Sequence, residues 1–203
     1  MNYDTIPSDE VINRAVESLK ANGIETFVVA NSEEAKAKVL ELIPEQSEVM
    51  TMTSETLRDT GITAEIDESG NFDSVRNKLN SMDGATQSRE MRKLGAAPDF
   101  TLGSVHAITE DGRLLIASNT GSQLPAYLYG AGTVVWVAGA QKITPNLEEA
   151  KRRVYEYVLP LESERAHKAY GVEGSFVSKL VTFNREVNPA RAKLIIVKEK
   201  LGF

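Results

Sequence analysis

A loop in the second half of the chain holds the residue types best suited to binding a small anion. The stretch "SNTGSQ" follows an apolar run and combines hydroxyl, amide and glycine residues, namely Ser118, Asn119, Thr120, Gly121, Ser122 and Gln123. Hydroxyl and amide groups donate hydrogen bonds, glycine lets backbone amides approach a ligand, and the amino terminus of a following helix adds about half a positive charge. The pattern therefore predicts a phosphate or carboxylate site. A glycine turn with Ser122 as a helix N-cap would use the same residues without a ligand.

Two further loops carry groups of the same kind. Thr53 and Ser54 follow an apolar run at residues 48–52, and Gly139 and Lys142 lie in "VAGAQKITPN" after another apolar run. If both runs are strands that point the same way, their loops open on one edge of a sheet, where the ligands of α/β proteins collect. We therefore expect all four residues to belong to the anion site. The alternatives are N-capping by Ser54 and a solvated loop lysine at Lys142.

Two residues have side chains suited to catalysis. Glu110 lies in "TEDG", a turn that would present it as a nucleophile or base, or leave it exposed for solubility only. His106 lies in the alternating stretch "GSVHAI", where it would act as a base near neutral pH or have a structural role. The chain has two histidines and no cysteine, so we expect no metal site and no iron–sulfur cluster held by thiolates.

Strand and helix patterns alternate in the first third of the chain. Apolar residues recur at helical spacing between Ser8 and Gly23, and a second helix pattern runs from Asn31 to Pro44. The predicted strands are residues 24–30, 48–52 and 62–66. This alternation is typical of βαβ units, which form a parallel sheet covered by helices.

The rest of the chain predicts a less regular arrangement. Apolar runs on both sides of Asp111 and Gly112 predict a hairpin, because an Asp-Gly turn needs positive φ, so one strand pair is antiparallel and the sheet is mixed. The other predictions are two helices within residues 72–94 broken at Gly84, a strand buried on both faces at 132–140, a helix from Asn146 that ends before Pro160, an irregular segment at 161–190 and a strand at 194–197. We therefore predict a single α/β domain over residues 1–203.

The charge and the hydropathy exclude several classes of partner. A formal net charge of −6 argues against nucleic acid, because phosphate backbones require a basic face. The stretch "MNYDTIPSDEVINR" is polar and lacks the regions of a signal peptide, and no apolar run approaches the ~20 residues that span a bilayer. These features predict a cytoplasmic protein without membrane contact.

One long stretch carries a family resemblance. "FTLGSVHAITEDGRLLIASNTGSQLPAYLYGAGTVVWVAGAQKITPNLEEAKRRVYEYVLPLESER" resembles the lactate utilisation (LUD) domain family in the order of its elements, and the resemblance continues to the terminal "IIVKEKLGF". It implies a three-layer α/β/α fold with a mostly parallel mixed sheet, of the sugar-phosphate isomerase and CoA-transferase type. Relatives with that fold bind phosphorylated sugars, CoA thioesters or folates at the edge where the "SNTGSQ" loop lies, which supports the anion site.

The resemblance also implies a part in bacterial L-lactate oxidation, in which family members work with iron–sulfur partner subunits. The first hypothesis is a protein that binds a small anionic, phosphorylated or CoA-like ligand at residues 118–123, with its cofactors unknown. The second is a non-catalytic accessory subunit whose segments 80–97 and 161–190 grip an iron–sulfur redox partner. The third is an acyl or CoA transferase with Glu110 as nucleophile, since CoA transferases of this fold carry a glutamate followed shortly by glycine, as in "TEDG". "LVTFNREVNPARAK" would serve a contact between two copies of the chain or a lid.

Overall fold

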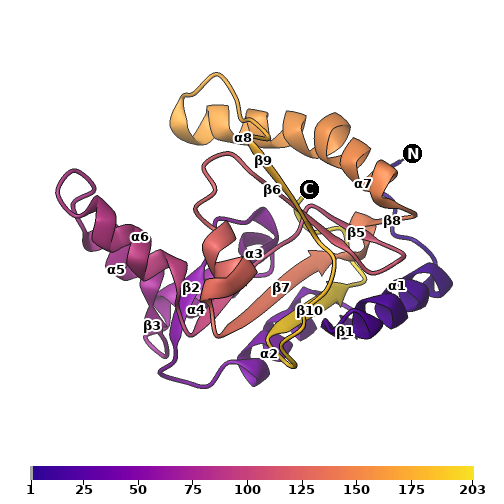
Figure 1. The fold of residues 1–203 in the computed structure, drawn as a ribbon, viewed down its shortest axis with the longest axis horizontal. Coiled ribbons are helices and arrows are strands. Elements are labelled where there is room, and N and C mark those ends of the chain that lie inside the picture. Colours follow the sequence, from indigo (N-terminus) through magenta and orange to yellow (C-terminus); the bar gives the residue numbers. More distant parts are fainter. Residues whose placement is uncertain (1) are drawn as a thin grey trace.

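A sheet of parallel strands runs through the middle of the molecule (Figure 1). The computed structural model describes residues 2–203. Within them, the strands of this main sheet are β1 (Glu25–Val29), β2 (Glu48–Thr51), β3 (Asp73–Ser74), β4 (Phe100–Gly103), β7 (Thr133–Gly139) and β10 (Ala192–Val197). They lie in the order β1-β10-β7-β4-β2-β3, and each neighbouring pair is parallel. β7 is buried from Val134 onward, as predicted for a strand covered on both faces.

A second, smaller sheet packs against one face of the main sheet. Its strands are β5 (Ala107–Thr109), β6 (Leu114–Ser118), β8 (Ile143–Thr144) and β9 (Lys179–Phe183), in the order β8-β5-β6-β9. The predicted hairpin is present, because β5 and β6 pair antiparallel and Gly112 between them has a φ of +80°. However, it lies outside the main sheet. β2 and β7 occupy both edges of β4, so the chain that follows β4 finds no free edge there.

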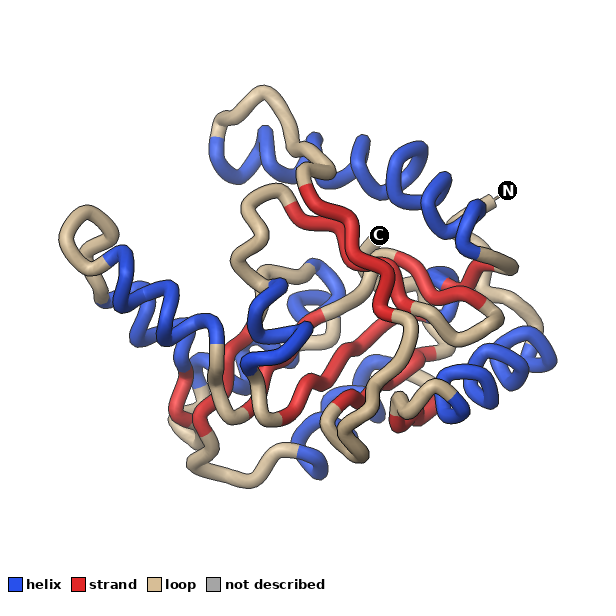
Figure 2. Tube along the Cα trace, viewed as in Figure 1, coloured by secondary structure: helices blue, strands red, loops and turns tan. Residues whose placement is uncertain are grey.

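Helices cover both sides of these sheets, as the tube in Figure 2 shows. The α-helices are α1 (Asp9–Ala21), α2 (Ser32–Leu42), α3 (Glu55–Asp59), α4 (Ile62–Glu68), α5 (Val75–Ser81), α6 (Ser88–Ala96), α7 (Leu147–Arg152) and α8 (Leu159–Tyr170). The other helical elements of residues 2–203 are two π-helical turns and one 3₁₀ turn. The π turns are η1 (Ala126–Gly130) and η3 (Arg153–Val158), and the 3₁₀ turn is η2 (Ala140–Lys142). None of the helices in the described part of the chain is both long and apolar enough to cross a membrane.

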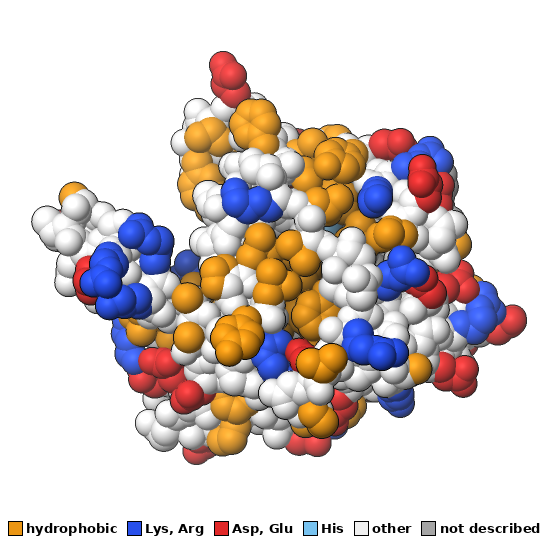
Figure 3. Space-filling view, in the orientation of Figure 1, with side chains coloured by type: hydrophobic (Ala, Val, Ile, Leu, Met, Phe, Trp, Pro, Cys, Tyr) orange, Lys and Arg blue, Asp and Glu red, His pale blue; other side chains and the backbone are white. Residues whose placement is uncertain are grey.

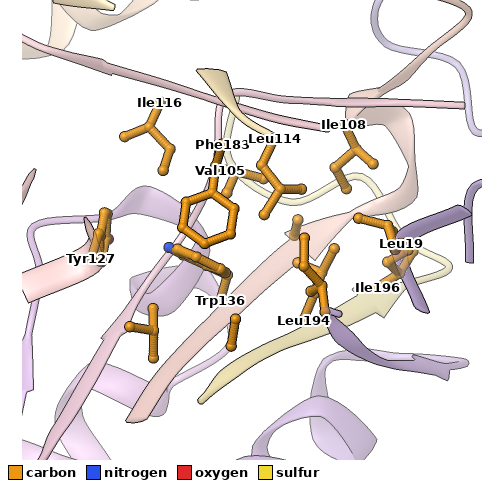
Figure 4. Packing of buried hydrophobic residues seen from close by; sticks show 14 of the residues in the cluster. Leu19, Val105, Ile108, Leu114, Ile116, Tyr127, Trp136, Phe183, Leu194 and Ile196 are labelled. Carbon is orange, nitrogen blue, oxygen red and sulfur yellow. The ribbon is translucent and has the colours of Figure 1, made fainter. Parts of the chain in front are cut away.

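The side chains of β7 alternate between two hydrophobic cores. Val135 and Val137 pack on one face with residues of α2, α3 and α4. Trp136 and its neighbours on the other face pack with α1 and the second sheet (Figure 4). There the Trp136 ring meets Tyr127 and Phe183 edge-on, at centroid distances of 5.6 and 5.3 Å. Because successive side chains of a strand point to opposite faces, the predicted continuous apolar strand lies between two cores.

The prediction of a strand at residues 62–66 is wrong, because these residues belong to α4. Ile62 and Ile66 are buried and lie four residues apart, whereas Ala64 between them is exposed. Four-residue spacing fits a helix, and a run of five residues is too short for its periodicity to separate a helix from a strand.

The prediction that the helix after Asn146 ends before Pro160 is also wrong. The Asn146 side chain accepts a hydrogen bond from the Glu149 amide at 3.0 Å and begins α7, which continues through η3 into α8 and ends at Gly171 with a φ of +68°. Pro160 directly follows η3, so it lies where the π turn already interrupts the regular α-helical hydrogen-bond pattern. The segment predicted as irregular, residues 161–190, therefore contains most of α8 and the edge strand β9.

Candidate functional site

A cavity of about 820 Å³ opens at the carboxyl edge of the main sheet. Its floor consists of the segments that follow β2, β4 and β7, and its walls come from the residue 118–123 loop, from α8 and from the helical hairpin of α5 and α6. This hairpin, residues 75–96, is called the arm below. In Figure 3 the arm projects at the left and leaves a hollow between itself and α8 at the top. The pair of helices broken near Gly84, as predicted, therefore forms one wall of the cavity.

The "SNTGSQ" loop lines this cavity with all six of its residues. The buried Ser118 hydroxyl accepts a hydrogen bond from the Gly121 amide at 2.8 Å and donates one to Gln123 Oε1 at 2.9 Å. Gly121 has a φ of +90°, a conformation that glycine adopts without strain. Thr120 and Ser122 are exposed at the mouth, with their hydroxyls 3.2 Å apart. The loop is therefore held by its own hydrogen bonds, and the two hydroxyls that it exposes at the mouth are hydrogen-bonded to each other.

The helix expected after this loop is present only as a short turn. It is the five-residue π turn η1, which begins after Pro125, and Ser122 is not its N-cap. Such a short turn has too few aligned peptide dipoles to supply the positive charge expected for an anion. The loop's contribution to ligand binding thus rests on its hydroxyl and amide groups.

Thr53 and Ser54 lie in the same cavity, at the end of β2. Ser54 Oγ accepts a hydrogen bond from the Leu57 amide at 3.3 Å and caps α3, as the capping alternative predicts. Thr56, two residues further on, is buried deeper and faces the residues that follow β4 and β7.

Lys142 is buried in the floor of the cavity, with 2% of its surface exposed. Its Nζ donates hydrogen bonds to Thr56 Oγ1 and Ser104 Oγ, both at 3.1 Å, and to the Val105 carbonyl at 3.2 Å. Burial, and then the nearby Arg153 guanidinium, lower the pKa of Lys142 from 10.5 to about 7, although Asp59 opposes the shift. The alternative of a solvated loop lysine is therefore wrong. With a pKa of about 7, a large fraction of the Lys142 amines is neutral at physiological pH.

Gly139 comes directly before η2 but does not line the cavity. A Cβ at this position would lie 2.1 Å from Gln141 Oε1 and 2.6 Å from the Glu199 carbonyl. The glycine lets residues 199–201 pass close to the end of β7, which is a packing role.

His106 lies in the cavity wall as a neutral imidazole. Its Nδ1 accepts a hydrogen bond from the Ala117 amide at 3.1 Å, which puts the ring proton on Nε2. Burial, followed by the positive charges of Lys142 and Arg153, lowers the pKa of His106 to about 3. This environment favours a hydrogen-bond donor over the predicted base near neutral pH.

Glu110 lies outside the cavity, at the turn of the hairpin between β5 and β6. Its Oε2 pairs with Arg14 Nη2 of α1 at 2.9 Å. The structure therefore does not bring Glu110 together with the hydroxyl loops or with Lys142.

Comparison with known proteins gives the family and the fold. A family model described as LUD domain matches residues 12–197. The chain belongs to the LUD domain family. No curated protein shows a significant match to it. Among solved structures, it is similar to the crystal structure of a DUF162 family protein from Deinococcus radiodurans, with a TM-score of 0.57 and 11% identity over 94% of this chain and 99% of that one. At this identity the likeness supports the fold alone, and the predicted three-layer α/β/α class with a mostly parallel central sheet is confirmed.

The charges that line the cavity of this LUD domain are unbalanced. Its two carboxylates are paired, Glu55 with Arg58 at 2.5 Å and Glu162 with Arg165 at 2.7 Å. By contrast, two lining arginines, Arg76 and Arg92, form no ion pair within residues 2–203, and Lys142, also without an ion pair there, adds a positive charge in its protonated fraction. The cavity therefore has an excess of positive charge in a chain whose formal net charge is −6.

Sequence reasoning missed several of these residues. Arg76 donates from Nε and Nη2 to the Thr51 carbonyl at 3.1 and 2.5 Å, and burial lowers its pKa. Ser104 follows β4 directly, and its position after a strand was the available signal. Arg76 carries no such signal, because only the packing of the arm against the sheet turns that side of α5 toward the cavity.

Proposed function

We propose that this LUD domain binds a small carboxylate or phosphorylated metabolite in the cavity at the carboxyl edge of its main sheet and takes part in L-lactate oxidation. The observation that carries the proposal is the charge imbalance of the cavity, where the carboxylates are paired and Arg76, Arg92 and Lys142 are not. Positive charges without a carboxylate partner in a concave site attract anions and raise their local concentration. The family name supports the assignment to lactate metabolism.

The shape and lining of the cavity support a small organic ligand. Its volume falls within the range of roughly 300–1,000 Å³ that is common for metabolite sites. Apolar side chains such as Met50, Leu79 and Met91 line part of it, and the hydroxyl groups of Thr120 and Ser122 lie at its mouth. A few polar groups in an apolar wall suit a ligand with a short carbon skeleton and one acidic group.

Thermal unfolding in the presence of candidate ligands tests the proposal. The panel is L-lactate, pyruvate, sugar phosphates, adenine nucleotides, CoA, acyl-CoAs and reduced folates. A ligand at a hundred times its dissociation constant stabilises the folded state by about 2.7 kcal/mol, which raises Tm by about 5–10 °C for a domain of this size. We expect such a shift with at least one carboxylate or phosphate, and its loss in the Thr120→Val, Ser122→Ala double variant.

Matched variants separate the cavity from general charge effects. Arg92→Gln removes a lining cation of α6, whereas Arg89→Gln removes a neighbouring cation of the same helix that does not line the cavity. We expect Arg92→Gln to weaken binding about two- to fivefold, since an exposed charge pair contributes up to about 1 kcal/mol, and Arg89→Gln to leave it unchanged. An equal effect of the two variants, or no Tm shift with any compound, would contradict the proposal.

A second candidate function is that of an accessory subunit for an iron–sulfur partner. Exposed aromatic side chains favour it, because Tyr129 in η1 and Phe176 before β9 are 91% and 69% exposed. The chain has no cysteine to hold a cluster, so electron transfer would need such a partner. Co-purification from the native cell at physiological salt tests this function. An iron-containing partner that is lost in Tyr129→Ser, Phe176→Ser supports it, and a chain isolated without one contradicts it.

A further inference from the structure

We infer that Lys142 is a nucleophile that forms a reversible imine with a carbonyl substrate carrying an acidic group, with 2-oxo acids as the matching class. The inference rests on the proposed function, because it names the substrate class of the same cavity. In this inference the Lys142 amine forms a covalent bond with the substrate, in addition to attracting its acidic group.

The position of the amine suits attack on a bound molecule. Lys142 ends η2, directly after β7, so its backbone is held by the most buried strand of the main sheet. The side chain lines the cavity floor and has no carboxylate partner within residues 2–203. Its three hydrogen bonds go to two hydroxyls and one carbonyl, which hold Nζ in place without fixing its charge. A neutral amine has two hydrogens, so in that form Nζ donates to two of these oxygens, and its lone pair can attack once no hydroxyl donates to it.

The electrostatic surroundings favour the neutral, reactive form. With a pKa lowered to about 7 by burial and by Arg153, about half of the Lys142 side chains are neutral at pH 7. An exposed lysine with a pKa near 10.4 is neutral only about once in 2,500 molecules at that pH. Lys142 therefore has a roughly thousandfold larger fraction of the nucleophilic amine than a surface lysine.

The proposed reaction needs no oxidant or reductant. The Nζ lone pair attacks the carbonyl carbon, the carbonyl oxygen takes up a proton, and a carbinolamine results. This intermediate loses its oxygen as water while the C=N bond forms, and both hydrogens of that water come from the amine. The hydroxyls of Ser104 and Thr56 lie 3.1 Å from Nζ and 3.3 Å from each other, so they can pass these protons between nitrogen and oxygen. Addition of water reverses the reaction.

The rest of the cavity selects the acidic group of the substrate. Hydroxyls of the 118–123 loop and the unpaired cations Arg76 and Arg92 lie in the walls around the amine. Their positive potential favours an anionic substrate over a neutral one in this cavity. A 2-oxo acid carries both groups on adjacent carbon atoms, whereas a neutral aldehyde offers only the carbonyl.

Reductive trapping tests the inference on the wild-type protein. The purified chain is incubated at pH 7 with pyruvate, glyoxylate or propanal, treated with sodium borohydride and analysed by intact mass and peptide mapping. We expect one adduct per chain with the two oxo acids, located on Lys142, and labelling of this residue at least about tenfold above any other lysine. We also expect propanal to label Lys142 more slowly than the oxo acids do.

Matched lysine variants give a second readout. Lys142→Met and Lys142→Arg remove the primary amine, and we expect both to lose the adduct. Lys179→Met is the control, because this exposed lysine also lies beside the loop, with its Nζ 3.2 Å from the Asn119 carbonyl. It should keep the full adduct. Since the mapping is done on wild type, an unfolded Lys142 variant does not prevent the test.

The outcomes separate this inference from the proposed function. If a panel anion raises Tm and no oxo acid labels Lys142, the inference is wrong and the proposed function stands. Labelling spread over surface lysines also overturns it. Equal labelling by propanal and pyruvate overturns the substrate class but keeps the nucleophile. If no compound raises Tm and no adduct forms, both proposals fail.

Discussion

At the scale of single residues, Lys142 combines burial with contacts to hydroxyl and carbonyl oxygens only, and Asp59 acts on it from outside these contacts. Moving an ammonium group out of water without a carboxylate partner costs free energy, and its three oxygen contacts offset only part of this cost. Because the charged form bears this cost, the pKa of Lys142 falls to about 7 and the neutral amine is favoured. A titratable side chain that is buried without a carboxylate partner is typical of functional sites.

The first prediction concerns the pH dependence of stability. Between pH 7 and pH 10 the unfolded chain keeps a proton on Lys142 that the folded chain has lost, so the free energy of unfolding rises with pH, by at most about 1.4 kcal/mol per pH unit. Relative to Lys142→Met, wild type should therefore gain stability over this interval and show no such gain below pH 6. Denaturant unfolding of both proteins at several pH values measures this difference, and a constant offset would show that the pKa is not lowered.

At the scale of elements, two π turns border the cavity. η1 contributes Tyr127 to its lining, and η3 contributes Val154 and Val158. π turns are rare and occur often at functional sites, because they shift side chains out of the regular helical positions. η3 also joins α7 to α8. Because the three elements form one continuous helical run, the cap at the start of α7 stabilises the amino-terminal end of that run.

The second prediction concerns that beginning. Asn146→Ala removes the side chain that accepts the Glu149 amide at 3.0 Å, and we expect a loss of about 1 kcal/mol in the free energy of unfolding. The control is Ser8→Ala, at the N-cap of α1, because the Ser8 side chain makes no capping hydrogen bond. Chemical denaturation should separate the two variants, and equal losses would show that the Asn146 cap has no specific effect.

At the scale of the whole molecule, Arg191 ties the main sheet to the cavity wall. It precedes β10, and its guanidinium donates to the carbonyls of Ala126, Tyr127 and Ala131 at 3.1 Å while it pairs with Glu186 at 2.7 Å. Both side chains of the ion pair are almost fully buried. The position of η1, and with it the Tyr127 side of the cavity, depends on this contact.

The third prediction tests this connection. Arg191→Met removes the guanidinium from the buried Glu186 carboxylate and from three carbonyls, and we expect a loss of about 3–5 kcal/mol in the free energy of unfolding. Arg152→Met removes an exposed arginine that pairs with Glu149 and Glu156, and it should change stability little because water already solvates those charges. Urea unfolding compares the two, and similar losses would contradict a special role for Arg191.

Prediction from the sequence succeeded for elements whose structure is determined by residues close together in the chain. The strands at residues 24–30 and 48–52, the helix that begins at Asn146 and the turn at Gly112 depend on periodicity, capping and backbone conformation, which act within a few residues. It failed for α4 because five residues do not define a period, and for the end of the helix at Pro160 because a π turn intervenes.

The sequence by itself determined the family, the α/β class and the loop at residues 118–123, since these follow from residue types and their order. Only the tertiary structure decided which of the candidate residues meet. It buried Lys142 against Thr56 of α3 and Ser104 after β4, and it paired Glu110 with Arg14 of α1 outside the cavity. The physical reason is that burial, pKa and charge balance depend on groups far apart in the chain, whose approach is set by the packing of the sheets and helices.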